Sequence, residues 1–190
     1  MSLSNEGRIV FEGVTHKGLE VILRYPQAGD APILLDFINT LSRELTFILF
    51  QGEQLTLDDE EKWLEARLAT IRAGKGAHVL AFSSGVLAGN TGIELGWGSN
   101  RHIGILGISV AQAFRGQGVG ELLMNAVINE AVTQLDLLRL IELEVFGNNT
   151  AAIKLYQKLG FVEYGRLPGG RLHRGQYVDN VYMYKPVKAL

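Results

Sequence analysis

The chain has 190 residues, of which 47% are hydrophobic and 20% charged, and this composition suffices for one globular domain with a packed core. Its formal net charge of −2 provides no broad basic field, so nucleic acid is not an expected partner. The absence of cysteine excludes disulfides, thiolate zinc sites and a cysteine nucleophile.

The N-terminal part of the chain predicts a β-hairpin followed by a helix. Residues 8–14 and 19–25 are rich in β-forming side chains and flank a turn. Asp30 and Pro32 favour the start of a helix. Its apolar residues recur at helical spacing as far as Leu41, so this face is expected to pack on a sheet.

A second helix is predicted to begin after Thr56. Thr56 and Asp59 match a capping box, and acidic residues fill the first turn of a helix that runs to about Gly74. Turn-forming residues then separate three β-rich runs. They predict an antiparallel meander with strands at residues 78–82, 86–95 and 102–110.

A glycine-rich loop connects the last of these strands to another helix. It reads Arg-Gly-Gln-Gly-Val-Gly over residues 115–120, and residues 119–134 carry apolar side chains at helical spacing. With a strand at 139–146, the order predicts a parallel βαβ unit, which binds ligands at the carboxyl ends of its strands. Successive N–H groups at a helix N-terminus suit a phosphate or pyrophosphate, although a tight turn without a ligand has the same pattern.

Three familiar functional motifs are excluded by particular residues in or near the loop. A P-loop requires lysine and then Ser or Thr after its last glycine, but Gly120 is followed by Glu121. A dinucleotide fingerprint requires glycine where Glu121 stands, and the chain shows one βαβ crossover instead of a series. A GxSxG nucleophile elbow is nearly matched, but its Ser109 lies inside a predicted strand.

The C-terminal part predicts one more helix and two closing strands. Residues 148–150 offer a cap for a helix whose apolar face includes Tyr156 and which ends at Gly160. Residues 161–167 and 177–184 then predict the two strands.

The organisation expected from these elements is one α+β domain over residues 1–190. Residues 1–17 would form an N-terminal extension or hairpin, including a short expression-derived start. No apolar run reaches about 18 residues and the N-terminus lacks a signal pattern, so we expect a cytoplasmic protein without a membrane partner. The four histidines lack metal-binding spacing, so no metal is expected.

Two short motifs narrow the choice of ligand. RGQGVG fits an RxxGxG signature, and NNTAAIKLYQKLGF, residues 148–161, carries Asn, Ala, Tyr and a terminal Gly-Phe in register. Together they resemble the GNAT-type N-acetyltransferases, most strongly over residues 102–161. The tail GQYVDNVYMYK further resembles small bacterial members that acetylate amino acids, polyamines or protein N-termini. The resemblance implies a mixed, mostly antiparallel sheet of about seven strands, about four helices and a parallel βαβ splay at the acetyl-CoA site.

The resemblance implies acetyl-CoA as co-substrate and assigns residues to it. Backbone N–H groups after the start of the loop would hold the pyrophosphate, the exposed strand edge before the loop would pair with the pantetheine arm, and a lysine would reach the 3′-phosphate. The residues implied are Ile108, Val110, Arg115, Gly116, Gln117, Gly118, Val119, Gly120, Asn149 and Lys158, with Lys154 as a second lysine.

Two catalytic residues are implied in the same way. Tyr156 matches the family's tyrosine acid, which protonates the departing thiolate, although its spacing alone fits a core aromatic residue. Glu144 matches a base glutamate twelve residues before the tyrosine. Glu142, on the same strand face, and Glu94 are alternative bases, and a water relay is another. A backbone N–H near residues 108–110 would meet the oxyanion.

The expected reaction is direct transfer of acetyl to a small-molecule amine or peptide N-terminus, since no cysteine is present to carry it. The first two helices and the turns near Trp97 and His173 would form the acceptor site, and Glu44, Glu53 and Glu94 would attract a cationic amine. Two other functions stay open: a non-catalytic acyl-CoA-binding regulatory module, and a protein that binds partners through its β-edges. A homodimer is compatible with the resemblance.

Overall fold

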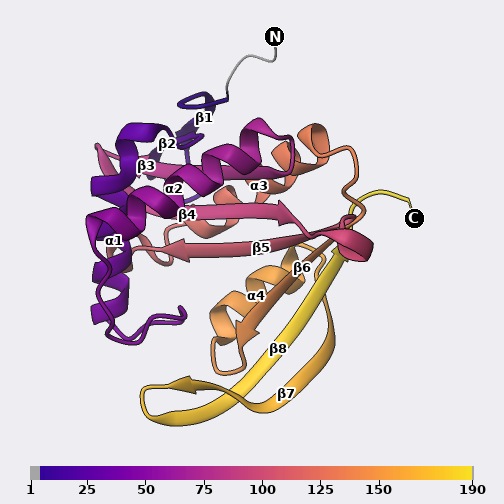
Figure 1. The fold of residues 1–190 in the computed structure, drawn as a ribbon. Coiled ribbons are helices and arrows are strands. Elements are labelled where there is room, and N and C mark those ends of the chain that lie inside the picture. Colours follow the sequence, from indigo (N-terminus) through magenta and orange to yellow (C-terminus); the bar gives the residue numbers. More distant parts are fainter. Residues whose placement is uncertain (1–4, 190) are drawn as a thin grey trace.

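The computed structural model describes residues 5–189 and contains one eight-stranded sheet with four α-helices (Figure 1). The beginning of the expected N-terminal extension lies outside the described residues. The strand order is β1-β2-β3-β4-β5-β6-β8-β7. The strands are β1 (Ile9–Val14), β2 (Glu20–Arg24), β3 (Gly76–Ser83), β4 (Val86–Leu95), β5 (Ile103–Val110), β6 (Leu140–Phe146), β7 (Val162–His173) and β8 (Gln176–Pro186).

The helices begin where the capping residues predict. Helix α1 (Ala31–Arg43) has Pro32 in its first turn, where a missing N–H costs nothing. Helix α2 (Leu57–Arg72) has the predicted capping box, because Thr56 accepts from the Asp59 N–H and the Asp59 carboxylate accepts from the Thr56 N–H. The remaining helices are α3 (Val119–Gln134) and α4 (Thr150–Lys158).

Two hydrophobic cores lie on opposite faces of the sheet. One contains buried residues of α1 and α2 with Leu80 and Leu87. The other contains the buried face of α3, Tyr156 of α4 and the apolar residues of the central strands. Successive side chains of a strand point to opposite faces of the sheet. The polar residues of β4 and β5 point to the α1–α2 face and leave a strip of it open for a site.

The parallel βαβ unit opens soon after it begins. β5 and β6 pair only from Ile103–Leu140 to Ile105–Glu142. Both strands continue beyond this point, β5 beside β4 and β6 beside β8. Figure 1 shows β6 and β8 diverging from β5. The predicted splay is therefore confirmed, and it places the carboxyl ends of two central strands on either side of a gap.

The sheet has eight strands where about seven were expected, and its last hairpin is longer than predicted. β7 continues through residues 168–173, which the sequence pattern leaves outside a strand. β7 stays paired with β8 because the register shifts between Glu163 and Gly165, and again between Leu167 and Arg171, where β7 has more residues than β8. This extension carries Arg171 and His173 to the site described below.

Candidate active site

The glycine loop presents a row of free backbone donors. Gly116 and Gly118 adopt φ angles of +71° and +88°, which favour glycine, and Gly118 is the N-cap of α3. The Leu122 N–H donates to the Gly118 carbonyl. Over residues 5–189, by contrast, no hydrogen bond uses the N–H groups of residues 116–121. Six consecutive unpaired donors at the positive end of a helix form a site suited to an anion.

A cavity of about 470 Å³ runs from this loop into the splay. Its walls come from β5, the loop, α4 and the segment after α1. Of the residues predicted for acetyl-CoA, seven line it: Ile108, Val110, Arg115, Gly116, Gly118, Gly120 and Asn149. The glycine loop and the second motif therefore meet around one cavity.

The edge of β5 runs along this cavity. The Ala111 N–H donates to the Ala88 carbonyl at 2.9 Å, so residues 111, 109 and 107 turn their backbone groups toward β4. Alternation then turns those of Ile108 and Val110 toward the gap left by β6. Asn149 faces them from the other side, where its Oδ1 caps α4 by accepting from Ala152 at 3.2 Å.

Three predicted donor-site residues do not line the cavity with their side chains. Val119 is buried in the core, and Gln117 donates to the Ala113 carbonyl at 2.6 Å, so each has only its N–H available for an anion. Lys158 donates to both oxygens of Glu121, at 2.7 and 2.8 Å. This contact lowers the pKa of Glu121 and keeps the lysine near the start of α3. Lys154 is exposed on α4.

Tyr156 lies where this first cavity meets a second one. Its side chain is 7% exposed, and burial raises its pKa to about 12. Among the described residues the hydroxyl has no hydrogen-bond partner, although Tyr156 lines both cavities. The phenol is therefore neutral at physiological pH, and its O–H is available to donate a hydrogen bond to a ligand. Its ring also packs 6.1 Å from Phe161, so it is a core aromatic residue as well.

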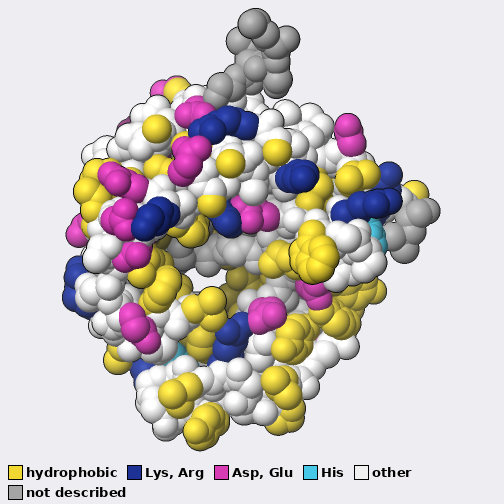
Figure 2. All heavy atoms as spheres, viewed as in Figure 1, with side chains coloured by type: hydrophobic (Ala, Val, Ile, Leu, Met, Phe, Trp, Pro, Cys, Tyr) yellow, Lys and Arg dark blue, Asp and Glu magenta, His cyan; other side chains and the backbone are white. Residues whose placement is uncertain are grey.

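The second cavity, about 640 Å³, has a floor without side chains. Gly92 of β4 pairs with Gly107 of β5, and both face the α1–α2 side of the sheet. The His78 ring lies over Gly92, where a Cβ would come within 2.5 Å of Nδ1, whereas a Cβ on Gly107 would meet no atom within 4 Å. Figure 2 shows the resulting hollow, with acidic and basic side chains at its rim. We call it the acceptor cavity.

Glu144, the predicted base, lines the acceptor cavity on the β6 side of the splay. Its carboxylate accepts hydrogen bonds from Arg171, at short range, and from Asn180 Nδ2 at 3.0 Å. Arg171 also stacks over Phe146, 5.4 Å from the ring centroid, and donates from Nε to Asn180 at 2.9 Å. These contacts fix the orientation of the carboxylate.

The two alternative bases occupy different places. Glu142 shares the face of Glu144 but lines a separate hollow of about 280 Å³ beside Trp97, so Trp97 does not contribute to the acceptor cavity. Glu94 does line that cavity. It accepts from Thr70 at 3.2 Å and forms an ion pair with Arg67 at 2.5 Å.

Two residues of β3 and β4 complete the polar wall. His78 Nε2 contacts Asn90 Oδ1 at 2.6 Å; since a carbonyl oxygen accepts, Nε2 carries the proton and Nδ1 is an acceptor. Burial lowers the pKa of His78 to about 4, so this histidine is neutral in the cavity. The Trp63 ring stands edge-on to it at 5.4 Å.

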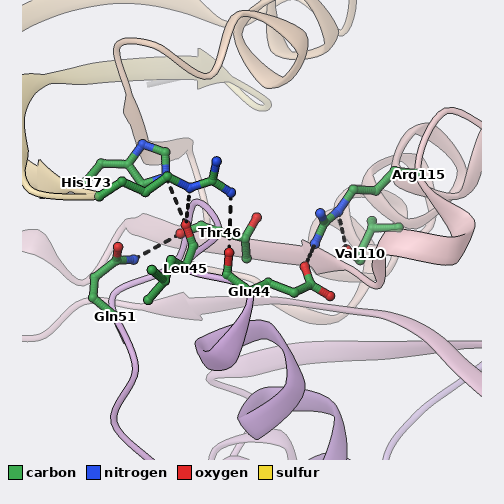
Figure 3. A network of polar contacts seen from close by, with 8 residues as sticks. Glu44, Leu45, Thr46, Gln51, Val110, Arg115 and His173 are labelled. Atoms are coloured by element: carbon green, nitrogen blue, oxygen red, sulfur yellow. Dashed lines mark hydrogen bonds and ion pairs between the residues drawn. The ribbon is translucent and has the colours of Figure 1, made fainter.

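The segment after α1 forms a roof over both cavities, which Phe47 and Ile48 line. Figure 3 shows how it is fastened. The Glu44 carboxylate accepts from Arg115 at 2.7 Å, and Arg115 also donates to the Val110 carbonyl at 2.9 Å. On the other side, the Leu45 carbonyl accepts from His173 at 3.1 Å. His173 supports the roof from behind and lines neither cavity.

Glu44 therefore serves the roof, whereas Glu53 is exposed and accepts from the Gln51 N–H, so neither lies in the acceptor cavity. The residues that sequence reasoning missed are Arg67, His78, Asn90, Gly107 and Arg171. Asn90, Gly92 and Glu94 alternate with Thr91 and Ile93, and this period of two would have revealed a polar face on β4.

Over residues 5–189, no group of three or more His, Asp or Glu side chains is placed to hold a metal ion. No helix of that part of the chain is long and apolar enough to cross a membrane.

Comparison with known proteins now adds to this geometry. The profile of the acetyltransferase (GNAT) family matches residues 37–161. The L-amino acid N-acetyltransferase AaaT of Escherichia coli (strain K12) is 39% identical over 82 residues, 43% of this chain and 50% of that protein. The chain spans about half the length of the curated relatives it matches.

Solved structures match over nearly the whole chain. The acetyltransferase of GNAT family from Streptococcus pneumoniae has a TM-score of 0.80 and 31% identity, covering 89% of this chain and all (100%) of that one. The phosphinothricin acetyltransferase of Sinorhizobium meliloti, solved with acetyl-CoA, has a TM-score of 0.74 over 88% of each chain; at 18% identity this likeness concerns the fold alone.

Proposed function

The chain belongs to the acetyltransferase (GNAT) family, and from this membership we propose that it transfers the acetyl group of acetyl-CoA to a primary amine by direct attack in a ternary complex. The observation that carries the proposal is the row of unpaired N–H groups at residues 116–121, which opens into a cavity ending at Tyr156. A pyrophosphate fits that row, and an extended pantetheine arm fits the edge of β5 at Ile108 and at the N–H of Val110.

The chemistry is assigned to the junction of the two cavities. Ile108, Ser109, Asn149 and Tyr156 line both, so the thioester carbonyl would lie there and the amine would approach from the acceptor cavity. As the new C–N bond forms and the C–S bond breaks, Tyr156 gives its proton to the leaving sulfur. Glu144 orients the incoming amine and takes the proton that the amine must lose, directly or through water. The acceptor would be a small amine, such as an amino acid or polyamine, or a peptide N-terminus.

The test is release of free thiol from acetyl-CoA in the presence of a panel of amines, amino acids, polyamines and N-terminal peptides. We expect Tyr156→Phe to lower turnover about ten-fold or more, the usual contribution of a positioned acid, with little change in acetyl-CoA affinity. Tyr164→Phe is the matched control, because Tyr164 is exposed on β7 and lines neither cavity. Unchanged turnover of the Tyr156 variant would contradict the assignment. Binding of acetyl-CoA without thiol release for any amine would favour a regulatory module.

A further inference from the structure

We propose that the acceptor is a free amino acid with an apolar side chain, and that Arg67 binds its carboxylate. This inference rests on the proposed acetyl transfer and narrows its acceptor. It starts from an arginine on the wall of the acceptor cavity whose hydrogen-bonding capacity is largely unused.

The contacts of Arg67 leave most of its donors free. One terminal nitrogen, Nη1, pairs with Glu94, and the guanidinium lies 5.7 Å from the centroid of the Trp63 ring. Its Nε–H is buried and, over residues 5–189, has no hydrogen-bond partner. A buried N–H without a hydrogen-bond partner lowers the stability of a folded protein, and a bound ligand can provide the missing acceptor. Glu94 and Trp63 therefore hold a guanidinium fork in place, and the group best shaped for such a fork is a carboxylate.

The charges around the cavity fit a zwitterion. Glu144 and Arg171 form an ion pair on the β6 side, and Arg67 and Glu94 form another on the β4 side, so the four groups sum to zero. An amino acid also has zero net charge, with its ammonium and carboxylate bonded to the same carbon. Its ammonium would lie beside Glu144 and Tyr156 and its carboxylate beside Arg67. A peptide N-terminus would present a neutral amide to Arg67, which offers the unpartnered Nε–H no anionic acceptor.

The strand register supports this orientation. Glu94 of β4 and Ile105 of β5 are paired neighbours, and Glu144 belongs to the next strand, beyond the splay. Two strand spacings, roughly 10 Å between backbones, separate Glu94 from Glu142, and Glu144 lies two residues farther along β6, where the strands have diverged. Long side chains reach inward from both ion pairs and shorten this distance. The glycine floor between them provides room for a small molecule.

Apart from Arg67, the side of the cavity formed by the helices and the roof is apolar. Ile38 of α1, Trp63 of α2 and the roof residues Phe47, Ile48 and Phe50 surround the space above the glycine floor. A hydrocarbon or aromatic side chain of the acceptor would be removed from water there, whereas a charged side chain would lose its hydration without a partner.

The experiment compares L-phenylalanine with L-phenylalaninamide as acceptors at saturating acetyl-CoA, measuring kcat/KM by thiol release. Wild type is expected to prefer the acid at least about ten-fold, the scale of one charge-assisted hydrogen-bonded contact. The amino group of L-phenylalaninamide is less basic than that of L-phenylalanine, so a larger fraction of it is neutral. Intrinsic reactivity therefore favours the amide, opposite to the preference expected of the enzyme. Arg67→Gln should lose about ten-fold or more on the acid and change little on the amide. Arg72→Gln, on the same helix but paired with Glu65 and Glu6 away from the cavity, should retain both rates.

The outcomes separate this inference from the function on which it rests. Equal use of acid and amide by wild type, or equal loss of both in Arg67→Gln, would overturn the role of Arg67 while acetyl transfer stands. Acetylation of peptide N-termini but not of amino acids would do the same. Failure to acetylate any amine would refute the proposed function, and the inference with it. The melting temperature of Arg67→Gln would show whether this variant folds. If it does not fold, the comparison of acid and amide in wild type still tests the role of a carboxylate in acceptor binding.

Discussion

His78 makes the stability of this protein depend on pH in a calculable way. Burial lowers its folded-state pKa to about 4 from an ordinary value of 6.5. Below pH 6.5 the unfolded chain binds a proton that the folded chain does not, so stability falls as the pH falls toward 4 and is constant above about 7.5. Linkage between these two pKa values gives a loss of about 2 kcal/mol between pH 7.5 and pH 5. For a chain of this length that corresponds to roughly 4 to 8 °C in melting temperature.

The assay is urea unfolding at several pH values between 5 and 7.5, for wild type and His78→Gln. Glutamine keeps an N–H donor for the Asn90 carbonyl but does not titrate. From pH 7.5 to pH 5, the unfolding free energy of His78→Gln should therefore decrease by about 2 kcal/mol less than that of wild type. His102→Gln controls for loss of a histidine elsewhere and should retain the decrease caused by His78. Parallel pH profiles for wild type and His78→Gln would refute the reasoning.

Two further substitutions test the two cavities separately. Gly118→Ala should weaken acetyl-CoA binding about ten-fold or more, as measured by calorimetry, because the new Cβ would come within 2.9 Å of His16 and shift the loop. Gly85→Ala is the control and should bind acetyl-CoA normally, because Gly85 also has a positive φ but has open space around it. Gly107→Leu should raise the KM for the amine several-fold by filling the floor of the acceptor cavity, and leave acetyl-CoA affinity unchanged. Since a Cβ there meets no atom within 4 Å, its melting temperature should stay close to that of wild type, and an unchanged KM would show that the amine binds elsewhere.

Local signals in the sequence predicted most of the fold. The hairpin, the capping box at Thr56, the meander and the βαβ unit are each encoded within one continuous stretch of the chain, which is the range over which turns, caps and periodicity act. The extension of β7 was missed because Pro168, Gly169 and Gly170 are typical of loops. Irregular pairing with β8 keeps these residues in the sheet, and a bulge depends on the partner strand, which local sequence does not reveal.

The donor and acceptor halves of the proposed site differ in predictability for a physical reason. The donor side uses backbone N–H groups from one continuous loop, so the glycines that permit this backbone are visible as a motif. The acceptor side uses side chains from α2, β3, β4, β6 and β7, which meet only through sheet register and through a β7 extension that was not predicted. Substitutions on the acceptor side leave the loop intact, so specificity can change there without loss of the donor. Arg67 and Gly107 are therefore the positions at which a change of acceptor is expected to begin.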